Sequence, residues 1–124
     1  MKKHYKDLLV WQKAIELAPN IYKLIHKLPE EETFALGMQL RRAVVSVASN
    51  VAEGQARKHV KEFLQHLRIA KGSLAELETQ IIIAEKLSYF TKKEVEQAEI
   101  EINEVSKILN ALLNSLSKTD NTLQ

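Results

Sequence analysis

Residues 39–54, QLRRAVVSVASNVAEG, place hydroxyl, amide, guanidinium and carboxylate groups among small apolar residues. A serine nucleophile needs a nearby base, and this stretch holds no histidine that could activate Ser46 or Ser49. On a helix, at about 100° per residue, its polar side chains form one stripe between about 80° and 180° from Arg41. The stripe consists of Gln39, Arg42, Ser46, Ser49, Asn50 and Glu53. Three interpretations stay open: a polar contact between helices or subunits, part of a ligand or nucleic-acid surface, or a solvated face.

The two arginines of this stretch need different surroundings. Arg41 points into the apolar arc, where a guanidinium needs a carboxylate or several carbonyl groups, and Glu76 or Glu78 are the candidate partners. Arg42 and Glu53 lie about 17 Å apart along the helix axis, which is too far for a direct ion pair. We therefore expect each of them to find its partner on another helix, another subunit, a ligand or water.

A second segment, GQARKHVKEFLQHLRIAK at residues 54–71, carries five basic side chains against the single acidic Glu62. Such side chains neutralise phosphates and release counterions, which gives affinity for nucleic acid of any sequence. The candidate nucleic-acid-binding residues are Arg57, Lys58, Lys61, Arg68 and Lys71. The alternative is that they solvate an ordinary surface. Phe63 belongs to an apolar helix face, so base stacking is poorly supported.

Metal and cofactor patterns are weak in this sequence. His59, Glu62 and His66 share about 60° of a helix, but no closing cysteine or aspartate is evident. Glu-x-x-His pairs, which di-iron bundles require, are absent, and three isolated glycines cannot form a phosphate or dinucleotide loop. We expect no metal, no cofactor and no enzymatic activity.

The composition indicates one helical domain. The chain has 124 residues with 45% hydrophobic and 27% charged residues, but only three glycines and two prolines. It contains no cysteine, so disulfides and thiolate chemistry are excluded. The N-terminus lacks the uninterrupted apolar core of a signal peptide, and no apolar run is long enough to span a membrane. We therefore expect a cytoplasmic location.

Apolar residues recur at spacings of three and four along four segments, which predicts an all-α, antiparallel up-down-up-down four-helix bundle within residues 1–118. The expected helices cover about residues 8–27, 30–53, 59–88 and 92–117, and we expect 119–124 to be a flexible tail. Thr91 and Glu94 form a capping-box pattern, and Gly54 is expected to end the second helix in a left-handed conformation. Pro19 should bend the first helix without ending it.

The apolar surface is wider than one stripe per helix. On the second helix, apolar residues cover more than half of the circumference, and the third helix adds four off-stripe residues. These are Leu40, Val44, Val45, Val47, Ala48, Val51 and Ala52, followed by Ile69, Ile82, Ile83 and Leu87. A large exposed surplus marks an interface, so we expect a homo-oligomer. A wider core packed by long tilted helices is the alternative.

The segment RRAVVSVASNVAEG, with DLLVWQKAIEL near the start and IAKGSLAELETQ further on, closely resembles the 23S rRNA intervening-sequence protein family over about residues 5–115. The resemblance implies an antiparallel bundle that assembles as a homopentamer. The chain is also similar to the accessory protein of diversity-generating retroelements, which implies nucleic acid or a reverse transcriptase as a partner. Pro19 and His59 depart from the family pattern without affecting the fold.

The resemblance also marks residues of the second and third helices as helix-contact positions. They are Arg41, Arg42, Ser46, Asn50, Glu53, Gly54, Gly72 and Glu76. A glycine inside a helix costs about 1 kcal/mol relative to alanine, so Gly72 and Ser46 suggest a close contact between these two helices. The leading hypothesis is a non-enzymatic oligomeric bundle that binds structured RNA or DNA. The rival hypothesis is a scaffold that docks a protein partner such as a reverse transcriptase.

Overall fold

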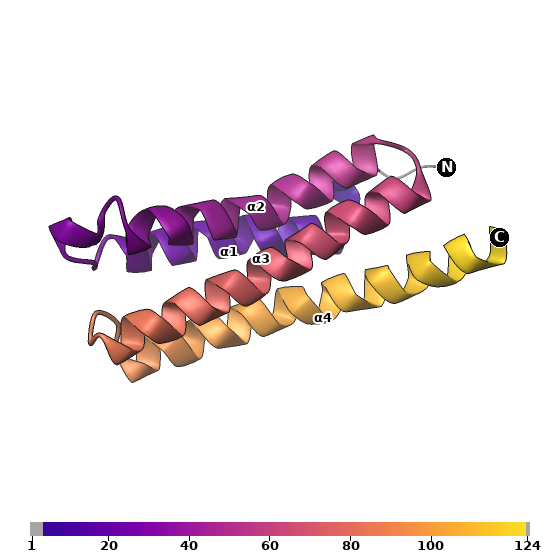
Figure 1. Cartoon of the computed structure of the whole chain (residues 1–124). Helices are drawn as coiled ribbons and strands as arrows, with labels where there is room; N and C mark the ends of the chain where they lie inside the picture. Colours follow the sequence, from indigo (N-terminus) through magenta and orange to yellow (C-terminus); the bar gives the residue numbers. More distant parts are fainter. Residues whose placement is uncertain (1–3, 124) are drawn as a thin grey trace.

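The computed structural model describes residues 4–123 and contains four long helices with no strand in that range (Figure 1). A short 3-10 turn, η1 (Tyr5–Asp7), precedes the first helix, and a second, η2 (Glu30–Glu32), lies between the first two helices. The helices are α1 (Leu9–Ile25), α2 (Leu36–Ala56), α3 (Val60–Lys86) and α4 (Lys92–Leu123). The all-α four-helix bundle predicted from the sequence is confirmed.

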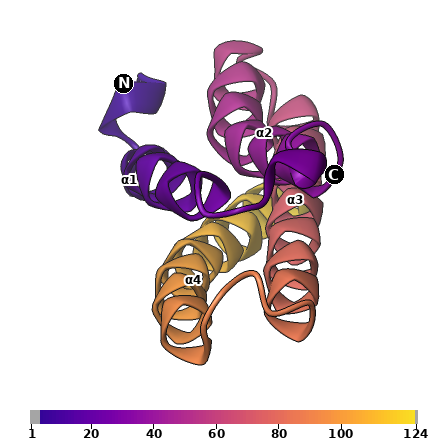
Figure 2. The ribbon, with the colours of Figure 1, turned by 90° about the vertical axis from the view of Figure 1, so that its left-hand side faces the viewer.

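The helices pack in the order in which they occur along the chain. α2 packs against α1 and α3, α4 packs against α3 and α1, and the backbones of the diagonal pairs stay apart within the described residues (Figure 2). The contact between α2 and α3 is the most extensive of the four, and that between α1 and α4 is the smallest. Short connections therefore join spatial neighbours, as expected for an up-down-up-down bundle.

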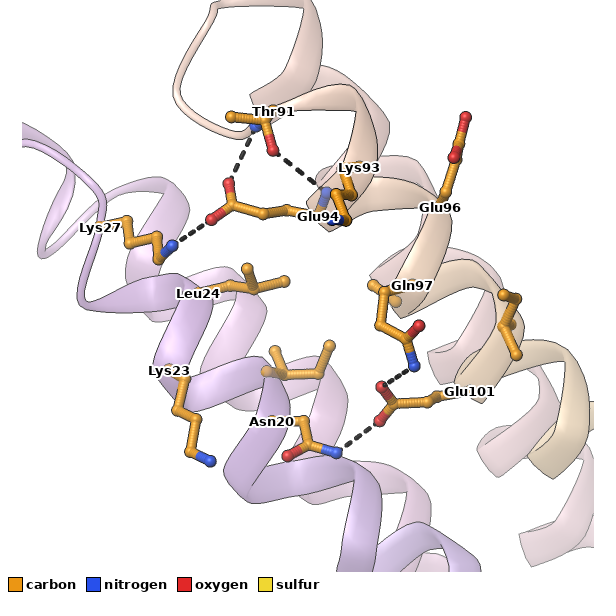
Figure 3. Close-up of a pocket in the computed structure, with 13 residues that line it drawn as sticks. Asn20, Lys23, Leu24, Lys27, Thr91, Lys93, Glu94, Glu96, Gln97 and Glu101 are labelled. Atoms are coloured by element: carbon orange, nitrogen blue, oxygen red, sulfur yellow. Dashed lines mark hydrogen bonds and ion pairs between the residues drawn. The ribbon is translucent and has the colours of Figure 1, made fainter.

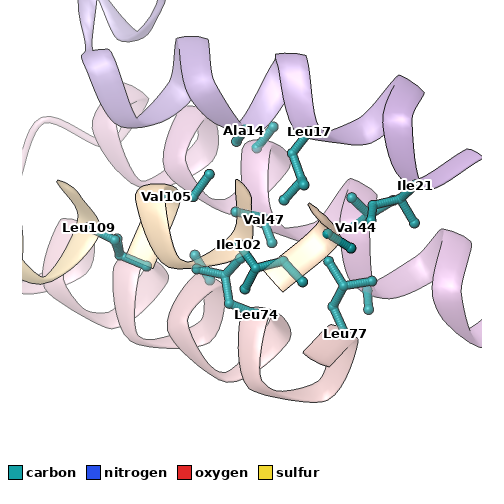
Figure 4. Packing of buried hydrophobic residues seen from close by; sticks show 14 of the residues in the cluster. Ala14, Leu17, Ile21, Val44, Val47, Leu74, Leu77, Ile102, Val105 and Leu109 are labelled. Carbon is teal, nitrogen blue, oxygen red and sulfur yellow. The ribbon is translucent and has the colours of Figure 1, made fainter. Parts of the chain in front are cut away.

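The core is formed by the predicted apolar faces (Figure 4). On α3, every apolar residue predicted for the core face between Leu67 and Ala84 is buried, while Phe63 is half-buried. Most of the wide apolar arc of α2 is also buried, because α2 packs against α1 on one flank and α3 on the other. Only Val45, 46% exposed, and the half-buried Ala52 remain accessible there.

The second helix begins later than expected. Pro29 was expected just before a helical start at residue 30, but its ψ of 156° is extended, and the three glutamates that follow form the turn η2 instead. The Glu32 side chain then accepts a hydrogen bond from the backbone N–H of Leu36 at 3.3 Å. An acidic side chain outside the helix thus satisfies one of the N–H groups left unpaired at the start of α2.

The end of the second helix also differs from the prediction. α2 continues through Gly54 to Ala56, and no glycine in the described residues has positive φ. The left-handed position is instead Lys58, with φ of 65°, in the connection to α3. The prediction that Gly54 is a left-handed cap is therefore wrong.

The first helix is not interrupted by its proline. α1 continues through Pro19, because the apolar spacing on both sides of the proline keeps the same face against the core.

Both ends of the last helix can be compared with the prediction. At the start of α4, Thr91 and Glu94 exchange hydrogen bonds of 2.9 and 3.1 Å, which confirms the predicted capping box. α4 extends to Leu123, six residues beyond the expected end at 117, because the C-terminal segment has no glycine or proline to break it.

Candidate functional site

A row of polar side chains lies along the contact between α2 and α3. Ser73 on α3, which is buried, donates a hydrogen bond of 2.8 Å to the hydroxyl of Ser46 on α2. Asn50 donates to both the backbone carbonyl and the hydroxyl of Ser46 at 2.9 Å. The Oδ1 atom of Asn50 lies 3.0 Å from Nδ1 of His66. These four residues, Ser46, Asn50, His66 and Ser73, are hereafter the α2–α3 polar cluster.

Toward the N-terminal end of α2, the contact with α3 contains a longer hydrogen bond between two glutamine side chains. The Gln80 side-chain amide donates to Oε1 of Gln39 over 3.5 Å. Gln80 is only 6% exposed, and its own Oε1 has no hydrogen-bond partner. A buried unpaired carbonyl oxygen costs about 1–3 kcal/mol, so this end of the contact is less well satisfied than the polar cluster.

α2 and α3 lie close together at Gly54. A Cβ atom added at Gly54 would lie 2.6 Å from Cβ of His66 and 3.1 Å from Cδ1 of Phe63. Gly72, which was expected to make the close contact with Ser46, is exposed, and a Cβ added there would meet nothing within 4 Å. The expected contact at Gly72 is therefore wrong, because Ser46 lies against Ser73. The spacing of Ser46, Asn50 and Gly54, four residues apart, was the signal that could have located the close approach.

The two arginines of residues 39–54 differ in their surroundings. Arg41 donates to the backbone carbonyl of Thr33 at 3.0 Å, so the predicted pairing with Glu76 or Glu78 is wrong. This carbonyl, at the end of η2, is within reach of Arg41 because η2 packs against α2. Arg42 and Glu76 are both exposed and form no ion pair within the described residues.

Glu53 connects the polar cluster to the basic segment. Its carboxylate lies 3.2 Å from the guanidinium of Arg57 and 4.0 Å from Nε2 of His66. His66 therefore has Asn50 on one ring nitrogen and Glu53 near the other. Ser46, by contrast, contacts no histidine in the described residues, so the geometry provides no base for a serine nucleophile.

The five candidate basic residues occupy the corner between α2 and α3 and the outer face of α3. Arg57 and Lys58 lie in the corner, and Lys61, Arg68 and Lys71 are exposed along the first half of α3. Lys61 and Arg68 are seven residues apart, so they project from nearly the same side of the helix about 10 Å from each other. Only Arg57 has an ion-pair partner among the described residues.

A small cavity opens beside this corner. Its volume is about 290 Å³, and Gly54, Lys58, His59, Phe63 and Leu112 contribute to its wall. His59 and His66 are not brought together with Glu62 as a metal site. In the described part of the chain no three histidine, aspartate or glutamate side chains are grouped to hold a metal ion.

The helices α1 and α4 enclose a larger pocket of about 850 Å³ (Figure 3). Lys27, in the turn after α1, pairs with Glu94 of α4 at one end, and Asn20 of α1 pairs with Glu101 further along. The Lys27 ammonium, helped by the backbone N–H of Thr91, holds the pKa of Glu94 below its ordinary value. Polar pairs at the edge of the pocket therefore connect α4 to α1 and to the turn after it, while the space between these pairs is open.

A model of the 23S rRNA-intervening sequence protein family matches residues 6–111, which include α1, α2, α3 and most of α4. The chain belongs to this family. A search of curated proteins finds no match. Among solved structures, the chain is similar to a protein of unknown function from the S23 ribosomal protein family of Bacteroides thetaiotaomicron VPI-5482, with 24% identity and a TM-score of 0.78.

That comparison covers 85% of this chain and 98% of the Bacteroides protein. The Bacteroides protein therefore shares the fold of this chain over nearly its whole length. No helix in the described residues of the present member is long and apolar enough to cross a membrane. The family match includes both the α2–α3 polar cluster and the basic corner.

Proposed function

We propose that this family member is a non-enzymatic, homo-oligomeric bundle that binds structured RNA through Arg57, Lys58, Lys61, Arg68 and Lys71. The observation that carries the proposal is the exposure of four cations, all but Arg57, without an ion-pair partner among the described residues. An unpaired cation can neutralise a phosphate without first breaking an internal ion pair. In an oligomer this patch recurs once per subunit, so that several weak contacts act on one backbone.

Apolar side chains on the outside of the bundle support assembly. The apolar arc of α2 contributes less exposed surface than expected, because Val44, Val47 and Val51 are buried within the chain. The exposed surplus includes Ile69, Ile82 and Ile83 on α3, Leu87 directly after it, and Leu9, Ile15, Val45 and Ile100 on the other helices. Covering these residues would remove apolar surface from water, which favours association. The pentameric state that the family resemblance implies is part of this proposal.

The RNA proposal is tested by binding of a labelled structured RNA across a salt series. Charge reversal of Arg57, Lys58 and Lys61 together should abolish retention at about 150 mM salt and flatten the salt dependence, since each lost phosphate contact lowers the slope by about one. The matched control reverses three exposed lysines away from the corner, Lys86, Lys92 and Lys107. Absence of binding by the unmodified protein at about 50 mM salt, or equal loss in the control, would contradict the proposal.

The alternative is a scaffold that docks a protein partner such as a reverse transcriptase. It is favoured by the exposed isoleucines of α3, Ile69 beside Arg68 and Ile82 and Ile83 further along the helix, which suit a protein surface better than a phosphate backbone. Affinity capture from nuclease-treated lysate separates the two functions. A defined partner that survives nuclease and is lost on Ile69→Lys with Ile83→Lys supports the scaffold, whereas capture that disappears with nuclease supports RNA.

A further inference from the structure

The cavity beside the basic corner is small and mainly apolar. It lies at the end of the bundle where α2 connects to α3, near the start of α1 (Figure 1). Its volume of about 290 Å³ is at the lower end of the range for small-molecule pockets, about 300–1,000 Å³, so it suits a single small ring system. The apolar part of its wall consists of Leu8, Val60, Phe63, Leu112 and Leu116.

The charge at this cavity has one sign. Lys58 and His59 line it, and no acidic residue does, whereas the larger pocket between α1 and α4 is lined by three lysines and three glutamates. Glu53 and Glu62, the acidic residues closest along α2 and α3, stay outside the wall, and Glu53 is already paired with Arg57. The cavity therefore suits a ligand that joins a ring to an anionic group.

Lys58 belongs both to the cavity wall and to the basic corner, and its backbone is strained. Its φ of 65° is a left-handed conformation that glycine adopts more readily than lysine. Its backbone N–H donates to the carbonyl of Gln55 at 3.3 Å, which a glycine would also do. The backbone thus gives no reason for a lysine at this position. Such conformations are retained where the side chain has a function.

Phe63 supplies an aromatic ring to the same wall. It is half-buried, so the core covers it only in part. Its Cδ1 atom packs over Gly54, where an added Cβ would lie 3.1 Å away. A ring that is held by its own helix contact and still borders a cavity provides a surface on which a planar base can stack.

We propose that this cavity binds a single unpaired nucleotide, with its base against Phe63 and its phosphate on Lys58. The neighbouring cations identify the occupant. Arg57 and Lys61 are exposed within three residues of Lys58, so the adjoining phosphates of a nucleic-acid chain also meet positive charge. An unpaired nucleotide presents both its base and its phosphate, whereas a paired base is held inside the duplex. The site deepens the proposed RNA binding and rests on it.

Two RNA duplexes test the site. They are identical except that one carries a single bulged 2-aminopurine, and in the other this base is paired with uracil. We expect the bulged RNA to bind at least about fivefold more tightly in fluorescence titrations at one salt concentration, as one base–aromatic stack provides. Equal affinities for the two RNAs would overturn the site and leave RNA binding by the basic residues in place.

Two variants separate the site from the fold, which thermal unfolding monitors. Lys58→Gly suits the left-handed backbone, so it should keep the stability of the protein while weakening binding of the bulged RNA more than that of the paired RNA. Ser88→Gly, at the other left-handed non-glycine position of the described residues, is the matched control and should change neither affinity. Phe63→Leu keeps an apolar wall and should lose the preference for the bulge. A preference that survives in Phe63→Leu, or equal behaviour of Lys58→Gly and Ser88→Gly, would overturn the site.

Adenosine monophosphate distinguishes a free nucleotide from an RNA as the source of the ligand. If neither RNA binds, the proposed function fails, and a titration followed by the chemical shifts of Phe63 and Leu112 decides the site. Binding that is lost in Lys58→Gly and Phe63→Leu, with no binding of ribose 5-phosphate, would support the site for a free nucleotide. No shift at millimolar adenosine monophosphate would then overturn it.

Discussion

The contact between α2 and α3 and the contact between α1 and α4 both join neighbouring antiparallel helices, but they are filled differently. Between α2 and α3, short side chains and Gly54 allow a close approach, and hydrogen bonds cross the contact in the polar cluster. Between α1 and α4, long charged side chains pair at the margins of a pocket of about 850 Å³. The bundle thus has one tightly packed side, between α2 and α3, and one open side, between α1 and α4.

The largest expected effect compares a core leucine with one that lines the pocket. Leu77→Ala should destabilise the fold by about 2–5 kcal/mol, because Leu77 is fully buried and a cavity remains. Leu24→Ala should cost about 1 kcal/mol, since half-buried Leu24 already borders open space. Urea denaturation of both variants gives the two values. Similar losses would mean that the α1–α4 side is packed as tightly as the core.

The next effect compares two glycines of α2 and α3. Gly54→Ala should destabilise by about 1–3 kcal/mol, because the new methyl group would lie 2.6 Å from Cβ of His66 and the helices must separate. Gly72→Ala, with nothing within 4 Å, should stabilise by about 0.5–1 kcal/mol through helix propensity. Midpoints of chemical denaturation measure both. A stabilising Gly54→Ala would show that α2 and α3 are not in close contact at this level.

A smaller effect concerns the polar cluster. Asn50→Ala removes three contacts and leaves a ring nitrogen of His66 without its partner, which should cost about 1–2 kcal/mol. Ser49→Ala, at the neighbouring exposed position, is the control and should change the free energy of unfolding by less than about 0.5 kcal/mol. Equal values for the two variants would indicate that the cluster contributes nothing beyond packing.

The smallest expected effect is a pH-dependent change in stability caused by Glu94, at the contact between α1 and α4. The pKa of Glu94 is lowered in the folded state, chiefly by Lys27, so its ionised form contributes stability above the ordinary value of 4.5. That contribution disappears as the pH falls through the lowered pKa. The stability difference between the unmodified protein and Glu94→Gln should therefore be positive at neutral pH and vanish in acid. Glu96→Gln, which removes no ion pair, should show no such dependence when thermal unfolding is followed across pH.

The architecture was predictable from sequence because it depends on repeated spacing. Residues such as Leu67, Leu74 and Ile81 recur with the helical period, and their burial follows from that period alone. The capping box of Thr91 and Glu94 is equally local, since both partners lie within four residues. Contacts of this kind can be predicted without knowing how the helices are arranged.

The partners of individual polar residues were not predictable in this way. Arg41 was assigned to a carboxylate on the next helix, but a connection that folds back places the Thr33 carbonyl closer. Gly72 was assigned to a helix contact, but the rotation of α3 about its own axis turns Ser73 inward and Gly72 outward. The pocket between α1 and α4 depends on the separation of two helices at opposite ends of the sequence, for which no local pattern exists.

The order of synthesis gives the smallest helix contact a further consequence. α2 and α3 are consecutive, so their hairpin can form while α4 is still being translated. α1 must wait for α4, the last of the four helices to be synthesised, before the pocket has its second wall. Until then the side of α1 that α4 covers, which includes Ala14 and Leu17, stays open to water.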